Sequence, residues 1–176
     1  MKVMVRHYVA PDFKSYAVRM SDGDYSKALD SLVIACVDIV IVHKELMLIG
    51  KRTVEPQSGW WIIGGRMIPG ESFTEAAARN VKRELSLNIK PFRFKYLNTQ
   101  SMVSPIRAQP PKNHGCHTVS IAMTLTITNN EAKDIKSSEE YEELKWMSPK
   151  DIVNGNSLKP HPALVQHAKD LIDFSQ

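Results

Sequence analysis

The chain has 176 residues, which is about the size of one domain, and it is long enough to bury a substantial hydrophobic core. No apolar run reaches the roughly 20 residues of a membrane-spanning helix, so we expect no membrane partner. The formal charge of +4 suits an anionic ligand. Because 23 basic and 19 acidic residues are mixed along the chain, without a long basic stripe, we do not expect a nucleic-acid partner.

Two cysteines, Cys36 and Cys116, provide no disulfide framework, which argues against a small secreted fold held by disulfides. The first six residues are too few, and too often interrupted by charge, to form the apolar core of a signal peptide. We therefore expect a cytoplasmic protein.

The N-terminal part of the chain predicts an arm followed by a short helix. Residues 1 to about 22 have no sustained hydrophobic period and predict an arm with one short strand, and a helix follows from Asp22 until just before Leu32. We accordingly divide the chain into an arm with a short helix at residues 1–31 and one folded domain at residues 32–176.

The next elements predict a buried hairpin. Residues 32–42 are almost wholly apolar and β-branched, which is typical of a strand covered on both faces. Asp38 interrupts this run, and a buried carboxylate needs a partner. After a turn at residues 43–45, a second apolar run returns and ends at Lys51 and Arg52.

The central stretch carries the chemistry. A strand-like run at residues 60–63 leads into a glycine loop that begins at Gly64, and Ser72 and Glu75 have the spacing of a capping box at the start of a helix. In a strand, glycine loop and helix with carboxylates, backbone carbonyls, side-chain oxygens and a phosphate can meet around a divalent cation.

The C-terminal half predicts further strands and a closing helix. Residues 92–103 and 118–127 read as strands, and the loop between them, 104–115, contains three prolines and could fold over a ligand. We expect an acidic loop at residues 129–143, a short strand at 142–147, and an amphipathic helix from about 160 to 172. These elements predict an α/β (α+β) fold in which a mixed β-sheet lies between helices.

The central stretch resembles the signature of the Nudix hydrolases: Gly, five residues, Glu, seven residues, then Arg-Glu-apolar-x-Glu-Glu-x-Gly-apolar. The order of the predicted elements agrees with that family from about residue 32 to residue 174. The resemblance implies a Nudix-type α/β/α sandwich and a hydrolase. The positions that match the signature are Gly65, Glu71, Arg79, Val81, Glu84 and Leu87.

Three positions depart from the signature. Asn80 and Arg83 stand where the family has glutamates, and Ser86 stands where it has a glycine. In the family, three helix glutamates ligate Mg²⁺ or Mn²⁺, and only Glu84 remains here. The Arg83 guanidinium could bind a phosphate bidentately, or it could fill the space of a lost metal.

The chain also resembles the GDP-mannose mannosyl hydrolase branch of the family, through Gly-Lys-Arg-Thr at 50–53, the Trp pair at 60–61 and Gly-Gly-Arg at 64–66. This likeness implies Mg²⁺, or Mn²⁺, on the Gly64 carbonyl, Glu84 and Glu140. It also implies that the side chains around the sugar and the diphosphate are Asp38, Arg52 and Arg66. Asp38 could equally be a buried carboxylate satisfied by the protein itself.

The catalytic histidine of that branch falls on Tyr141, so we expect Glu140 or Glu139 to assist the attacking water. Arg79 either orients carboxylates, touches phosphate or pairs with Glu75 on the helix surface. Attack at carbon and attack at phosphorus both stay open.

Two functions therefore compete. The first is Mg²⁺-dependent hydrolysis of a small nucleoside diphosphate substrate, a sugar nucleotide such as GDP-mannose before others, by a homodimer. The second is a Nudix-fold protein that binds a nucleotide or an RNA end and has lost hydrolysis.

Overall fold

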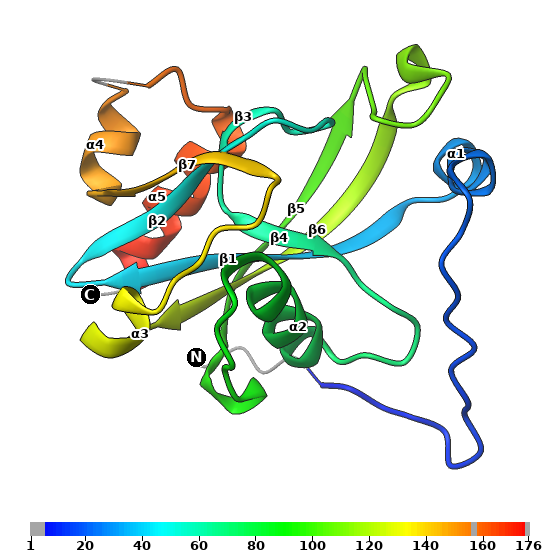
Figure 1. The fold of residues 1–176 in the computed structure, drawn as a ribbon, viewed down its shortest axis with the longest axis horizontal. Helices are drawn as coiled ribbons and strands as arrows, with labels where there is room; N and C mark the ends of the chain where they lie inside the picture. Colours follow the sequence, from blue (N-terminus) through cyan, green and yellow to red (C-terminus); the bar gives the residue numbers. More distant parts are fainter. Residues whose placement is uncertain (1–5, 156–157, 175–176) are drawn as a thin grey trace.

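A computed structural model gives the fold for residues 6–155 and 158–174 (Figure 1). The strands are β1 (Ile34–His43), β2 (Leu46–Arg52), β3 (Gly59–Trp61), β4 (Ile63–Arg66), β5 (Lys95–Ser104), β6 (Cys116–Thr126) and β7 (Tyr141–Met147). The helices are α1 (Asp22–Ser31), α2 (Phe73–Leu85), η1 (Pro91–Arg93), η2 (Lys112–His114), α3 (Asn129–Lys133), α4 (Pro149–Asn154) and α5 (Pro162–Phe174). None of these helices is long and apolar enough to cross a membrane.

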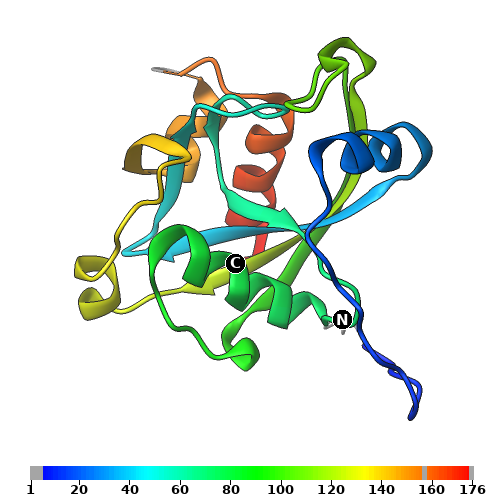
Figure 2. The same cartoon turned by 45° about the vertical axis from the view of Figure 1, so that its right-hand side comes forward.

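The seven strands form one mixed sheet in the order β3-β2-β1-β6-β5, with β4 also paired to β1 and β7 to β2. β1 runs parallel to β6 and antiparallel to β2 and β4. Helix α2 covers one face of the sheet and α5 covers the other (Figures 1 and 2). The predicted mixed sheet between helices is therefore confirmed.

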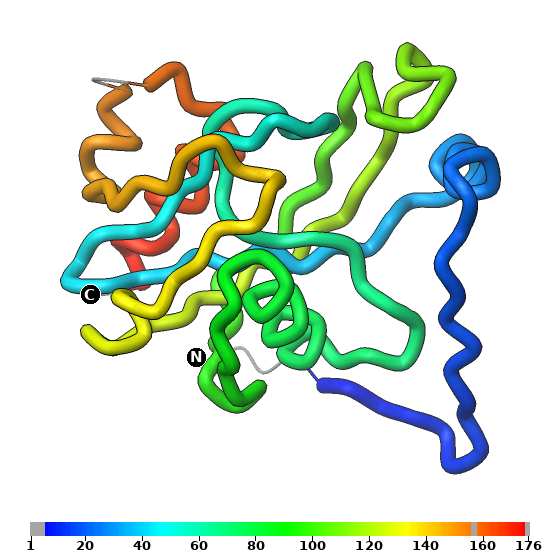
Figure 3. The backbone as a smooth tube through the Cα atoms, in the orientation of Figure 1, coloured from blue at the N-terminus to red at the C-terminus, as the bar shows by residue number. Residues whose placement is uncertain are grey.

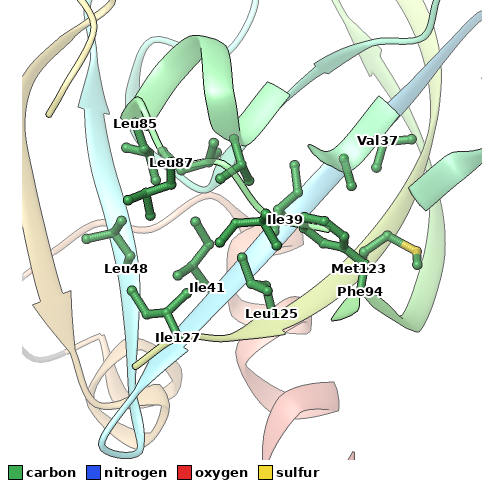
Figure 4. Packing of buried hydrophobic residues seen from close by; sticks show 14 of the residues in the cluster. Val37, Ile39, Ile41, Leu48, Leu85, Leu87, Phe94, Met123, Leu125 and Ile127 are labelled. Carbon is green, nitrogen blue, oxygen red and sulfur yellow. The ribbon is translucent and has the colours of Figure 1, made fainter. Parts of the chain in front are cut away.

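β1 is the centre of the core, because its two faces contribute to two hydrophobic clusters. Val37, Ile39 and Ile41 are fully buried on the side of α2, as Figure 4 shows. Val40 belongs to the cluster on the side of α5. This burial on both faces explains why the strand is apolar almost throughout.

Three local predictions were wrong. The arm, which Figure 3 shows running along the outside of the molecule, has no strand within residues 6–21, and residues 1–5 lie outside the described part. Residues 129–133 form a helical turn in the predicted acidic loop, because Thr128 and Glu131 make a capping box. The first part of the predicted glycine loop, residues 64–66, is instead in strand β4, since the chain changes partner at Ile62, from β2 to β1; residues 67–72 form a loop.

Helix α2 begins as predicted and ends on a strained residue. The capping box between Ser72 and Glu75 is present in full, which confirms the predicted start. Ser86, which stands where the family signature has glycine, closes the helix in the left-handed conformation at φ 61°. The helix therefore ends in the left-handed conformation that glycine favours, although the residue is a serine.

His167 is a buried neutral histidine whose titration should be visible in the stability of the protein. Burial lowers its pKa to about 4, and in an unfolded chain the pKa is near 6.5. A base whose pKa falls on folding contributes stability that is complete above the unfolded pKa and is lost as the pH falls toward the folded pKa. We expect urea unfolding to show that the titration of His167 lowers the free energy of unfolding by about 2.5 kcal/mol between pH 7 and pH 4.5.

The control compares two substitutions at histidines of the same region. His167→Gln should remove that part of the acid sensitivity, whereas His161→Gln, at an exposed position before α5, should leave it unchanged. An identical pH dependence in the unaltered protein and in His167→Gln would show that the pKa is not depressed.

Candidate functional site

Most of the predicted site residues, though not Glu84 or Arg79, line one open cavity of about 470 Å³ between the sheet, α1 and the loops at 53–58 and 105–115. Strand β1 contributes Asp38 and β2 contributes Arg52, while β4 contributes the glycines and Arg66. From the sequence-predicted set, the residues that line the cavity are Asp38, Arg52, Gly64, Arg66, Arg83 and Glu140. Glu139 is exposed and does not line it.

Asp38 is both a satisfied buried carboxylate and a wall of the cavity. Its side chain accepts a hydrogen bond of 2.5 Å from the Ser120 hydroxyl, and the residue is 5% exposed. Burial raises its pKa to about 6, against the influence of Ser120 and the nearby Arg52. Gly64 lies directly opposite on β4, where a Cβ would come within 2.1 Å of the carboxylate. Glycine at this position therefore leaves the room that Asp38 needs.

Two arginines stand at the cavity with capacity to bind an anion. Arg52 approaches Glu140 at 3.5 Å, and its Nε is buried without a hydrogen-bond partner among the described residues. The Arg66 guanidinium lies 4.3 Å from the ring centre of Tyr25, a cation–π contact that holds the exposed side chain in place. Tyr25 belongs to α1, so the short N-terminal helix forms part of the site.

Glu84 is buried at the end of α2, where it is 1% exposed, and burial raises its pKa. The hydroxyl of Tyr141 donates to one carboxylate oxygen, and Nη2 of Arg83 donates to the other. The same Nη2 is 3.3 Å from the Gly64 carbonyl oxygen. Neighbours on a helix point about 100° apart, so Arg83 reaches Glu84 only by folding back toward β4.

Arg79 and Asn80 join the start of α2 to β4 and carry no cavity surface. Arg79 donates to Glu71 and, at 2.8 Å, to the carbonyl of Arg66, while Glu75 belongs to the helix cap instead. Asn80 is fully buried and donates to the Gly65 carbonyl at 3.2 Å. Both side chains therefore position β4. Of the alternatives for Arg79, the surface pair with Glu75 is not formed, and the contact with the Glu71 carboxylate agrees with an orienting role.

The residues present do not fit a divalent cation in this arrangement. Each of the three implied ligands already contacts an arginine: the Gly64 carbonyl and Glu84 contact Arg83, and Glu140 contacts Arg52. No group of three His, Cys, Asp or Glu side chains among the described residues could hold a metal ion. A cation beside the guanidinium would be repelled by it, because the two would share a single buried carboxylate.

Two side chains of the site were missed by reasoning on the sequence. Tyr25 offered no signal, since aromatic residues in short helices are common. Arg107, 1% exposed, donates to Asp30 at 2.7 Å and to Ser26 at 2.7 Å, and so ties α1 to the loop at 105–115, beside it in Figure 2. The three prolines of that loop did predict an element able to cover a ligand, and residues 107–109 line the cavity.

The NUDIX domain model matches residues 33–169 of the chain. The chain belongs to the Nudix family. Hydrolases of this family act on nucleoside diphosphate derivatives and generally use divalent metals such as Mg²⁺.

Solved structures of other proteins share this Nudix fold. A MutT NUDIX hydrolase from Burkholderia pseudomallei is 19% identical, with a TM-score of 0.62 over 80% of this chain and 99% of that one. The E. coli dihydroneopterin triphosphate pyrophosphohydrolase is 15% identical, with a TM-score of 0.60 over 82% and 99%. At such identities these likenesses concern the fold alone.

A curated relative matches a shorter stretch. The low-salt glycan biosynthesis protein Agl8 of Haloferax volcanii is 31% identical over 72 residues, which are 40% of this chain and 46% of that protein. The match thus spans about half the length of that relative.

We expect Arg107→Leu to destabilise the protein by about 2–4 kcal/mol, because it leaves buried acceptors on α1 and the loop unpaired. Urea unfolding measures this loss. Lys27→Leu serves as the control on α1: Lys27 makes an exposed pair with Asp24, and such pairs contribute about 0–1 kcal/mol. Equal losses in the two variants would contradict a special role for the buried contact.

Proposed function

We propose that the chain hydrolyses a nucleoside diphosphate derivative bound in the cavity, and that a sugar nucleotide such as GDP-mannose is the first candidate. The observation that supports this most is the group of side chains around one cavity: Arg52, Arg66 and Arg83 for the diphosphate and Asp38 for a sugar hydroxyl. Arginine suits phosphate oxygens because its planar guanidinium offers paired donors. The cavity volume lies within the range of small-ligand sites.

Within this proposal the arginines neutralise the diphosphate, and Glu140 directs a water molecule at the reacting atom. Glu140 has the better position, because it lines the cavity and Glu139 does not. Its pairing with Arg52 keeps the carboxylate beside the diphosphate. Attack of the water oxygen on the sugar carbon breaks the carbon–oxygen bond to the diphosphate and gives the free sugar and a nucleoside diphosphate. Attack on phosphorus breaks the phosphoanhydride bond and gives a nucleoside monophosphate and a sugar phosphate.

Two likenesses support a sugar nucleotide. The motifs at residues 50–53, 60–61 and 64–66 resemble the GDP-mannose mannosyl hydrolase branch. The relative in Haloferax volcanii is named as a low-salt glycan biosynthesis protein. The division into an arm with a short helix at 1–31 and a Nudix domain at 32–176 belongs to the same proposal, and the homodimer and the cytoplasmic location stay predictions.

The second function, nucleotide binding with weakened hydrolysis, is favoured by the contacts of Glu84. Both of its carboxylate oxygens are engaged, by Arg83 and by Tyr141. Mg²⁺ or Mn²⁺ stays a prediction for this chain. Either ion could bind the Glu84 carboxylate only if Arg83 left it.

A turnover assay separates the two functions. Sugar nucleotides and dinucleoside polyphosphates are incubated with the protein, with and without Mg²⁺, and the products are identified by chromatography. The first function predicts turnover of a sugar nucleotide, and the products reveal whether carbon or phosphorus is attacked. Binding without turnover of any substrate would support the second function and overturn the first.

We expect Arg52→Gln and Arg66→Gln each to weaken GDP binding by about tenfold to 100-fold, which corresponds to the loss of one charge-assisted hydrogen bond. Calorimetry measures the affinity, and Lys44→Gln, at an exposed turn away from the cavity, is the matched control. If all three variants bind GDP as the unaltered protein does, the diphosphate does not lie in this cavity.

A further inference from the structure

The Glu84 carboxylate requires a positive partner close by, because a buried charge without one is strongly unfavourable. Among the described residues, the side chains that donate to it are Tyr141, which is neutral, and Arg83, which is positive. A phenol is protonated and uncharged at neutral pH, so Tyr141 contributes a hydrogen bond and no charge. The countercharge of Glu84 therefore comes from Arg83.

Arg83 also bridges two of the oxygens that the family resemblance assigns to a metal. One nitrogen, Nη2, contacts both the Glu84 carboxylate and the Gly64 carbonyl. Gly65 makes this approach possible, since a Cβ there would lie 2.8 Å from Nη2. The Arg83 guanidinium thus lies between the Glu84 carboxylate and the Gly64 carbonyl oxygen.

The charges around this position balance without any further cation. Asn80, where the family signature has a glutamate, is neutral and is satisfied by the Gly65 carbonyl and by Arg79. Arg83 stands where the signature has another glutamate. At that position the chain therefore has a positive charge in place of a negative one. Glu84 already has Arg83 as its countercharge, and Glu140 has Arg52. The buried Asp38 accepts a hydrogen bond from Ser120, so the carboxylates of this site all have partners within the protein and attract a divalent ion weakly.

Arg83 keeps donors for a ligand while it holds Glu84. A guanidinium has five N–H donors, and the contacts with Glu84 and Gly64 use one nitrogen. The side chain is 47% exposed and lines the cavity together with Arg52 and Arg66. These three arginines bring positive charge to the cavity from α2, β2 and β4, as a diphosphate requires.

We propose that Arg83 is a built-in cation that replaces the divalent metal at this site, so that the chain binds the diphosphate group of its ligand without Mg²⁺ or Mn²⁺. The part that concerns the diphosphate rests on the proposed function. The part that concerns the metal rests on the contacts of Arg83 alone.

Mn²⁺ binding tests the metal part without any nucleotide. Electron paramagnetic resonance of free Mn²⁺ is recorded with the unaltered protein, Glu84→Gln, Arg83→Ala, and Arg83→Ala combined with Glu84→Gln. Lys82→Ala is the control on the same helix. The unaltered protein and Lys82→Ala should bind no Mn²⁺, whereas Arg83→Ala should bind one ion and lose it when Glu84 is also changed. Mn²⁺ binding by the unaltered protein that Glu84→Gln abolishes would overturn the proposal, as would the absence of binding in Arg83→Ala.

Calorimetry with GDP, in EDTA and in Mg²⁺, tests the diphosphate part. The affinity of the unaltered protein should be the same in both solutions, and Arg83→Gln should weaken binding in EDTA by about tenfold or more, while Lys82→Gln should not. GDP binding that requires Mg²⁺ would overturn the proposal. Failure to bind GDP in either solution would instead count against the proposed function, and the Mn²⁺ measurement would then decide the role of Arg83.

Discussion

The buried carboxylate of Glu84 is the constraint on which the rest of the site depends. It binds Arg83 on its own helix and Tyr141 on β7, and through Arg83 it connects to the Gly64 carbonyl on β4. The backbone carbonyl of Glu84 also accepts from the Ser138 amide, which fixes the chain just before β7. One residue therefore joins α2, β4 and β7 around the place where a Nudix fold holds its chemistry.

The cavity beside this network combines three positive side chains with a buried carboxylate. Arg66 is held from outside the matched domain, by Tyr25 of α1, and Arg107 in turn ties α1 to the loop that covers the cavity. The fold supplies the sheet and helix that all Nudix proteins share. Under the proposed function, side chains of the N-terminal helix and the proline-containing loop would adapt this shared fold to the ligand of this chain.

The sequence allowed the predictions that depend on local pattern. An apolar, β-branched run identified β1, and serine and glutamate three residues apart marked the start of α2. Contacts between distant residues were out of reach. Arg83 could bind phosphate or fill a metal position, and the choice depends on a carbonyl 19 residues away; Arg107 and Asp30 are 77 residues apart. Likewise, the chain pairs with β2 before Ile62 and with β1 after it, and no residue next to Ile62 predicts this change.

The central claim is that a guanidinium takes the position of a metal ion in this Nudix site. A crystal structure of the protein with GDP and Mn²⁺, with anomalous scattering recorded for manganese, tests it most directly. The account predicts a diphosphate in contact with Arg52, Arg66 and Arg83, Arg83 still on Glu84, and no manganese signal between Gly64 and Glu84. A manganese signal on Glu84, with Arg83 turned away, would contradict it.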